Sequence, residues 1–188
     1  PDVLNKCPEI ENIRLTEDDK KKGLMYQQQL ERKKMESSAS NLGDFLRALD
    51  INIEIKPADS FSIPRIAQLT QKTNQFNMTT KRYTESDIIQ FIDSRDTHVY
   101  SISSTDKFGD NGIIGVIIFY LKDDACIIDT FLLSCRVIGR SIEQSIVAFI
   151  AEFAGNIGVK TLIGEFYPTQ KNKPAADVYE KMNFKKID

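Results

Sequence analysis

The segment Arg136–Ser141 has the residue types and spacing of a phosphate-binding turn. It reads Arg-Val-Ile-Gly-Arg-Ser and lies between an apolar run and an amphipathic one. A helix N-terminus carries unpaired N–H groups and a partial positive charge. Gly139 would let a phosphate approach the backbone, Arg136 and Arg140 would add cations, and Ser141 is expected to cap the helix. The pattern predicts a pyrophosphate site, with an ordinary capped helix bearing solvated arginines as the alternative.

A thiol and carboxylates could supply nucleophilic or acid–base chemistry. Cys135 directly precedes Arg136, and a neighbouring guanidinium and helix start favour a thiolate that could relay an acyl group. A buried, inert cysteine is the alternative, and Cys126 should face the other side of the same strand. Asp129 and Glu165 fall in predicted strands, where each is either a general base or a solvated side chain.

Polar residues also gather between two predicted helices, at positions 72–83. Amides and cations in such a loop could grip an anionic substrate such as a glycerate or a phosphopantetheine. The predicted substrate-binding residues are Lys72, Asn74, Gln75, Asn77, Thr80 and Arg82. A structured polar loop and a basic RNA-binding patch are the alternatives, and the overall net charge of −2 disfavours RNA.

Composition limits the class of protein. The chain has 188 residues, of which 41% are hydrophobic and 28% charged, as in a soluble domain with or without an appendage. No apolar run is long enough for a membrane span, and no signal-peptide pattern is present, so we expect a cytoplasmic protein that binds neither membrane nor nucleic acid. The 3 cysteines without CxxC spacing and the single histidine, His98, argue against a disulfide framework and a metal site.

The elements that must position these residues follow from hydrophobic periodicity. From about residue 50 the order is strand, two helices, three antiparallel strands, helix, strand, helix and strand, which predicts a mixed sheet flanked by helices, an α/β (α+β layered) domain. We expect helices at 16–38, 41–50, from Pro64, from a Thr84–Asp87 capping box, at 141–157 and at 174–182; strands at 51–57, 98–104, 113–122, 125–134, 160–167 and 183–187; and a turn at 108–112.

Two motifs resemble GNAT-type N-acetyltransferases. Arg136–Ser141 resembles their acetyl-CoA loop, with Ser141 where glycine or alanine is usual. The ending "KNKPAADVYEKMNF" resembles the end of that superfamily's domain, with Asn183 where glycine is usual. Asparagine tolerates the left-handed conformation, so the second departure is mild. The matched positions are Asn172, Ala176, Tyr179 and Phe184.

The resemblance implies a GNAT-like fold that binds CoA, acetyl-CoA or a phosphopantetheine arm between strands 126–134 and 161–167. The implied cofactor-binding residues are Arg136, Val137, Ile138, Gly139, Arg140, Ser141 and Asn172. Tyr179 would protonate the leaving thiolate, or else merely pack on its helix. Glu165 becomes the better candidate base, because its strand would line the thioester site. No metal is implied.

A second resemblance, to FkbH-like proteins, covers nearly the whole chain. It is carried by residues 64–88, by "SCRVIGRSIE", by "PTQKN" and by the polar leading segment. Such proteins join a haloacid-dehalogenase-type domain to a GNAT-like domain and are associated with forming glyceryl-acyl-carrier-protein for methoxymalonyl polyketide units. The resemblance implies that residues 1–48 are the tail of that upstream domain and 49–188 the acyltransferase domain, with an acyl carrier protein as partner.

Three functions therefore remain open. The first is an acyltransferase that uses a phosphopantetheine thioester. The second is a non-catalytic module that docks a carrier protein, and this function would explain the lack of an obvious base. The third is N-acetylation of a small amine unrelated to polyketides.

Overall fold

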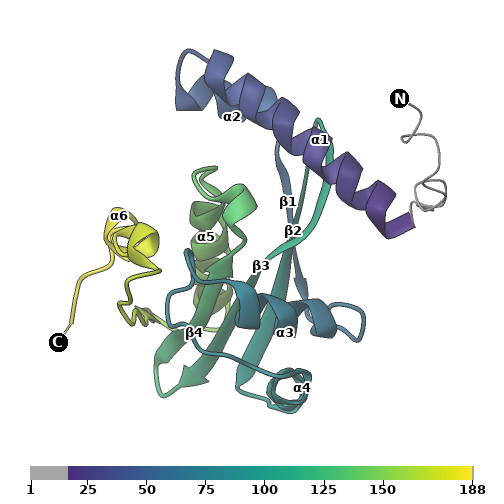
Figure 1. The fold of residues 1–188 in the computed structure, drawn as a ribbon. Coiled ribbons are helices and arrows are strands. Elements are labelled where there is room, and N and C mark those ends of the chain that lie inside the picture. Colours follow the sequence, from purple (N-terminus) through teal and green to yellow (C-terminus); the bar gives the residue numbers. More distant parts are fainter. Residues whose placement is uncertain (1–16, 188) are drawn as a thin grey trace, which may run out of the picture. The chain divides into compact units, whose positions relative to one another are not determined.

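The computed structural model describes residues 17–187, with side chains from residue 23 onward (Figure 1). Cys7 and the predicted capping residue Thr16 lie outside the described residues. The helices and strands, in chain order, are α1 Glu17–Ser38, α2 Leu42–Leu49, β1 Asn52–Pro57, α3 Ile63–Lys72, α4 Glu85–Asp93, β2 Thr97–Asp106, β3 Gly109–Lys122, β4 Ala125–Leu133, the 3₁₀ turn η1 Cys135–Val137, α5 Ile142–Asn156, β5 Thr161–Gly164, the 3₁₀ turn η2 Lys173–Ala175 and α6 Val178–Lys181.

The chain divides into two compact units. The first comprises the residues up to Leu49 together with Lys107–Gly109, and the second comprises the remainder. Within the first unit, the buried Arg32 places its guanidinium 5.9 Å from the ring centre of Phe108. The main chain of Lys107 donates a hydrogen bond to the carbonyl of Leu49. That residues 1–48 close an upstream domain stays a prediction.

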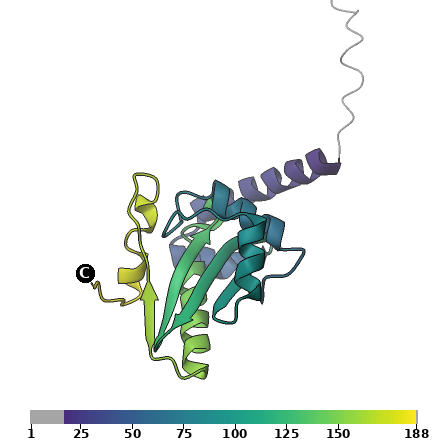
Figure 2. The same ribbon diagram turned by 90° about the horizontal axis from the view of Figure 1, so that it is seen from below.

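The second unit is built on a five-stranded sheet of order β1-β2-β3-β4-β5. Strand β1 runs antiparallel to β2, β3 runs antiparallel to β4, and β4 runs parallel to β5. Strand β5 lies at the edge of the sheet (Figure 2). The predicted mixed sheet flanked by helices is confirmed.

Alternation along the strands places one core on each face of the sheet, as a pleated strand requires. On one face, Phe119 of β3 and Phe131 of β4 belong to the same buried cluster as Ile146 of α5. On the other face, Ile118 of β3 packs with residues of α3 and α4, including Ile66. The sheet therefore separates α5 from the α3–α4 pair.

Local signals in the sequence set several element ends correctly. The main-chain N–H of Asp87 donates to the Thr84 hydroxyl at 3.2 Å, and the Asp87 carboxylate accepts from the Thr84 N–H at 2.7 Å, so the capping box is confirmed. Pro64 lies in the first turn of α3, as expected. Gly158 follows α5 with φ +81°, and Asn183 follows α6 with φ +63°, the left-handed conformation that ends helices.

A predicted turn and a predicted strand differ from the structure. The turn expected at 108–112 is shorter, because β3 already begins at Gly109. The Asn111 side chain donates to the Asp106 carboxylate at 3.2 Å and so joins the two strands beyond the turn. The strand expected at 183–187 does not form, because the chain leaves α6 through the left-handed Asn183 without meeting a partner strand in the described residues.

Candidate functional site

Strand β4 has a β-bulge at Asp129, next to the point where its pairing with β5 ends. Ile118 pairs with Thr130 while Phe119 pairs with Ile128, so Asp129 between them has no partner on β3. Bulges bend a strand and re-aim side chains, and they recur next to active sites. Strand β5 pairs with β4 only as far as Gly164 opposite Ile128, so the strand predicted to reach residue 167 ends earlier.

A segment of the chain itself lies beside β4 beyond this point. The Met78 N–H donates to the Phe131 carbonyl at 3.0 Å, and the Leu133 N–H donates to the Phe76 carbonyl at 3.0 Å. On the other side, the Tyr167 N–H donates to the Met78 carbonyl at 2.9 Å. The segment Phe76–Met78 therefore takes backbone groups of β4 that a bound amide-containing arm could otherwise use.

Asn172, predicted to bind cofactor, fastens this segment instead. Its buried side-chain amide donates to the carbonyls of Asn77 at 2.9 Å and Tyr167 at 3.0 Å. Its Oδ1 atom accepts from the N–H and the hydroxyl of Thr169, at 2.7 and 2.9 Å. An asparagine side chain has two donors and two acceptor positions, so protein groups use its full capacity. Asn172 thus positions the segment and has no hydrogen bond left for a ligand.

A cluster of charged and phenolic groups lies beside the bulge. Lys81 Nζ is 2.5 Å from Asp129 Oδ1 and 2.9 Å from Glu165 Oε2. The Tyr83 hydroxyl donates to Asp129 at 2.8 Å, and the Tyr167 hydroxyl donates to Glu165 at 3.2 Å. Lys81 Nζ also lies 5.5 Å from the centre of the Tyr167 ring. The cluster joins residues from the loop after α3, from β4 and from the segment after β5.

Electrostatics fix the protonation of the cluster. Burial lowers the pKa of Lys81, but the hydrogen bonds to Asp129 and Glu165 outweigh it and leave that pKa above its usual value. Burial raises the pKa of Tyr83, and the hydrogen bond to Asp129 raises it further. At neutral pH Lys81 is therefore a cation and Tyr83 a neutral donor.

The predicted phosphate loop joins β4 to α5. Gly139 is exposed with φ +81°, and a Cβ there would meet nothing within 4 Å. Ser141 has the expected N-cap position, but its backbone is left-handed (φ 58°) and its hydroxyl makes no capping hydrogen bond. An N-cap residue normally has extended backbone, which aims its oxygen at the helix N–H groups. Ser141 therefore leaves the first N–H groups of α5 without a side-chain acceptor of its own.

The two arginines of the loop point to different places. The Arg140 side chain is buried, with its NH1 atom 3.6 Å from the carboxylate of the buried Asp106, and so is not the solvated cation of the sequence alternative. Arg136 is half-buried and donates to the Ser134 hydroxyl and to the Asn111 carbonyl, each at 3.3 Å. Arg140 thus anchors the base of the loop, and Arg136 is the guanidinium nearer its surface.

The remaining predicted loop residues divide by burial. Val137 is buried in the core, and Ile138 packs against that core with part of its surface exposed. Cys135 is exposed in η1, and no hydrogen bond joins it to the charged cluster in the described part of the chain. Cys126 is buried in β4, and burial raises the pKa of its thiol to about 11.

A groove leads to the predicted phosphate loop. It has a cavity volume of about 160 Å³ and separates the start of α5 from α6. Its lining residues are Phe76, Ile138, Gly139, Glu143, Gln144, Pro174, Asp177, Val178, Lys181 and Met182. The start of α5 is therefore open rather than sealed. The sequence gave no reason to select Glu143, one of whose carboxylate oxygens is buried without a hydrogen-bond partner among the described residues.

Tyr179 lies against β5. Its hydroxyl is buried and has no hydrogen-bond partner within the described residues. Burial raises the pKa of Tyr179, and the negative charge of Glu165 raises it further. The phenol is therefore protonated at neutral pH and has a hydrogen to donate, as an acid for a leaving thiolate needs.

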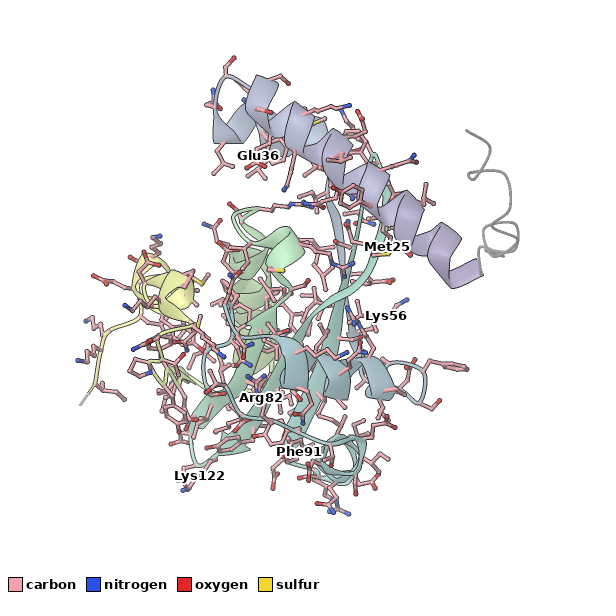
Figure 3. The ribbon with its side chains drawn as sticks, viewed as in Figure 1. Met25, Glu36, Lys56, Arg82, Phe91 and Lys122 are labelled. Atoms are coloured by element: carbon pink, nitrogen blue, oxygen red, sulfur yellow. The ribbon has the colours of Figure 1, made fainter. Side chains whose placement is uncertain are left out.

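The predicted substrate loop mainly stabilises itself. Asn77 donates to the Thr73 carbonyl at 3.2 Å and accepts from the Thr80 N–H at 2.9 Å. Arg82, labelled in Figure 3, donates to the Thr73 carbonyl at 2.9 Å and also to the Asn74 side chain. The other members, Lys72 and Gln75, are exposed.

The residues of this loop that reach the charged cluster, Lys81 and Tyr83, were not selected from the sequence. Their spacing held a signal, because residues two apart in an extended segment point to the same side. Tyr167 of the same cluster was missed as well. Of the predicted catalytic residues, Glu165 belongs to the cluster, and its negative charge raises the pKa of Tyr179.

Comparison with solved structures shows what the fold is. The ribosomal-protein-S18-alanine N-acetyltransferase from Escherichia coli matches 73% of this chain and 80% of its own, with TM-score 0.56 and 13% identity. The chain has the GNAT acetyltransferase fold. AAC(6')-Iy in complex with the bisubstrate analogue CoA-S-monomethyl-acetylneamine matches 73% of this chain and 93% of its own, with TM-score 0.55 and 8% identity.

The aminoglycoside 6'-N-acetyltransferase AAC(6')-Ih from Acinetobacter baumannii is similar too, over 73% of this chain and 93% of its own, with TM-score 0.56 and 7% identity. Scans against protein-family models and curated proteins find no match. Identities this low establish the GNAT fold alone. The FkbH-like origin, and the site residues carried over by resemblance, stay predictions.

Two further findings concern the described residues only. No helix among them is both long and apolar enough to cross a membrane. No group of three or more His, Cys, Asp or Glu side chains among them is arranged to hold a metal ion.

Proposed function

We propose that this chain is an acyltransferase domain of GNAT fold that binds the phosphopantetheine thioester of CoA or of an acyl carrier protein. The observation that carries the proposal is the groove that opens onto Gly139 and the uncapped start of α5. Unpaired N–H groups at a helix start bind phosphate through hydrogen bonds and the helix dipole. The fold supports the same reading, because the solved structures compared above are acetyltransferases.

The residues of the loop and Tyr179 of α6 have distinct tasks in this proposal. The backbone N–H groups of Ile138–Ser141 hold the pyrophosphate, with Arg136 as the cation. The N–H of the buried Val137 instead donates to the Ser134 carbonyl at 3.1 Å, so Val137 is not one of the phosphate donors. Arg140 keeps the loop in place through Asp106. Tyr179 donates its proton to the thiolate that leaves when the acyl group is transferred. The bound CoA or carrier supplies the thioester, and the protein supplies orientation and proton transfer.

Glu165 is the better base of the two carboxylates. Asp129 accepts hydrogen bonds from Lys81, Tyr83 and Thr130, which occupy both of its oxygens. The bonds to Glu165 from Lys81 and Tyr167 both end on Oε2. Its Oε1 atom therefore retains capacity to accept a proton.

The resemblance to FkbH-like proteins supports a finer proposal. The substrates would be a glyceryl or related acyl group and a carrier protein, on the route to methoxymalonyl polyketide extender units. Residues 1–48 would then link this domain to a haloacid-dehalogenase-type domain. Acyl transfer between a synthetic holo carrier and CoA, measured by intact-protein mass spectrometry, tests this part separately.

Calorimetric titration with CoA, acetyl-CoA and holo carrier protein tests the phosphate site. We compare the wild type with Arg136→Ala, and use Arg47→Ala in α2 as a control of equal charge change, since the ion-pair partner of Arg47 among the described residues is Asp44 of the same helix. Loss of a charge-assisted hydrogen bond should weaken binding about 10-fold or more in Arg136→Ala alone. Equal binding by all three proteins, or no binding by the wild type, would remove the assignment.

One observation favours a docking module as the second candidate. Phe76–Met78 already pairs with the β4 backbone at Phe131 and Leu133, where an inserted arm would need partners. A single-turnover assay with Tyr179→Phe separates the candidates. Slower transfer with unchanged CoA affinity supports the acyltransferase, whereas carrier binding without any transfer by the wild type supports docking.

A further inference from the structure

The Lys81 ammonium has the surroundings of a bound amine substrate. It lies 2.5 Å from Asp129 and 2.9 Å from Glu165, and 5.5 Å from the ring centre of Tyr167. Carboxylates and an aromatic face are the groups that proteins use to bind an alkylammonium. The exposed fraction of the Lys81 side chain is only 29%. The ammonium is thus a largely enclosed ligand of the cluster rather than a surface ion pair.

A braced backbone delivers this lysine. Phe76–Met78 is hydrogen-bonded to β4 on one side and to Tyr167 on the other, and Asn172 fastens it through the Asn77 carbonyl. Thr80, directly before Lys81, has a left-handed backbone (φ 56°), and its N–H donates to Asn77. A non-glycine residue adopts that conformation only where its surroundings hold it. The position of Lys81 is therefore built into the loop.

We propose that Lys81 occupies the amine position of the acceptor site, so that the folded domain transfers acyl groups to a neutral hydroxyl or thiol and not to an amine. The proposal rests on the proposed acyltransferase function and names its acceptor class. A second ammonium would have to displace Lys81 or share its carboxylates, and two like charges at one site disfavour each other. A hydroxyl or thiol carries no charge and meets no such repulsion.

The transfer balances with the residues at hand. The acceptor O–H or S–H proton passes to Glu165 as its oxygen or sulfur bonds to the thioester carbonyl carbon. The carbon–sulfur bond of the donor breaks, and the leaving thiolate takes the proton of Tyr179. Glu165 then returns its proton to the Tyr179 oxygen. The net result is one acyl ester or thioester and one free thiol, with both residues restored.

The decisive experiment uses no acyl donor. Lys81→Ala removes the ammonium and the stem, and n-butylammonium replaces both. We expect millimolar n-butylammonium to raise the melting temperature of Lys81→Ala by several degrees, and equal concentrations of n-butanol or tetramethylammonium to have no such effect. The wild type and Lys81→Met, whose uncharged side chain fills the space, should not respond. If Lys81→Ala is unfolded, the refolding yield with each additive replaces the melting temperature.

Equal responses of wild type and Lys81→Ala, or no rescue by n-butylammonium, would overturn the proposal. So would acyl transfer by the wild type to n-butylamine at the rate found for a thiol or alcohol acceptor. CoA affinity is measured on the same proteins. If the wild type binds CoA but rescue fails, only the role of Lys81 is wrong; if it does not bind CoA or a holo carrier, the proposed function itself is wrong.

Discussion

The Tyr179 ring lies so close to Gly164 that no other residue fits there without movement. A Cβ built at Gly164 would come within 2.4 Å of the ring carbon Cζ of Tyr179. Real Cβ atoms do not approach other atoms so closely, and the obstacle is a ring rather than a flexible chain end. The end of β5 and the start of α6 are therefore fitted to each other at the buried hydroxyl proposed to be the acid.

Gly164→Ala should displace Tyr179 and destabilise the domain. Because overpacking of this kind typically costs about 1–3 kcal/mol, we expect a loss of that size in the free energy of unfolding, and urea unfolding measures it. The displaced hydroxyl should also reach solvent, so the raised pKa of Tyr179 should move back toward 10 in a spectroscopic titration. Gly155→Ala in α5 is the matched control, since a Cβ there meets nothing within 4 Å. Unchanged stability and titration in Gly164→Ala would contradict the packing.

Asn172→Ala should cost more than an ordinary surface substitution. It leaves the carbonyls of Asn77 and Tyr167 without their donor, and unsatisfied buried groups cost about 1–3 kcal/mol each. We expect a loss of roughly 2–4 kcal/mol in the free energy of unfolding on the same basis. Gln75→Ala removes an exposed amide from the loop that contains Asn77 and should be nearly neutral. Equal losses for the two variants would show that the Asn172 side chain does not stabilise the 76–78 segment.

Glu143→Gln should tighten the binding of CoA and of ADP. The Glu143 carboxylate lines the groove beside Gly139 and would repel a phosphate there. Removing one negative charge from the lining of the groove, near the protein surface, should favour phosphate binding by about 1 kcal/mol, or roughly fivefold in affinity. Glu152→Gln makes the same charge change at an exposed position of α5. The gain should shrink with added salt, and a gain of equal size in both variants would point to net charge alone.

His98 should make the protein less stable in mild acid. Its ring centre is 5.2 Å from that of Phe119 and 4.8 Å from that of Phe153. Burial lowers the pKa of His98 below 6.5, and the charge of Asp96 offsets this only in part. The unfolded chain therefore binds a proton at His98 more readily than the folded protein does. The contribution of neutral His98 to stability is fully present above pH 6.5 and is lost as the pH drops through the folded pKa.

NMR titration of the single histidine measures this pKa directly, and His98→Phe should flatten the dependence of unfolding free energy on pH over that range. A folded-state pKa of His98 at or above the unfolded value would contradict the prediction.

Much of the fold was predictable because its signals are local. The Thr84–Asp87 capping box depends on residues three apart, and the alternation along β3 is visible in a single run of sequence. The loop before α5 was placed for the same reason, since glycine, arginine and a helix start are adjacent, and its binding of phosphate stays a prediction. These features are set by backbone preferences and by periodicity, which need no knowledge of distant partners.

The rest depends on partners that are far apart in sequence. Lys81 meets Asp129 and Glu165 across 48 and 84 positions, and its spacing from Tyr83 does not reveal these partners. Arg140 was predicted to add a cation to the phosphate site, because the sequence does not show that the carboxylate of Asp106, in β2, lies beside it. Ser141 was expected to cap α5, and its left-handed backbone follows from the path of the turn rather than from its type.

The hydrogen bond between Asn172 and Asn77 spans 95 residues, which has a consequence for how the molecule is made. A ribosome delivers the N-terminal side of a domain first, and pairings distant in sequence wait for their second member. The 76–78 segment therefore emerges long before its fastener does. During synthesis, the Asn77 carbonyl therefore has no hydrogen bond from Asn172 until residue 172 has left the exit tunnel.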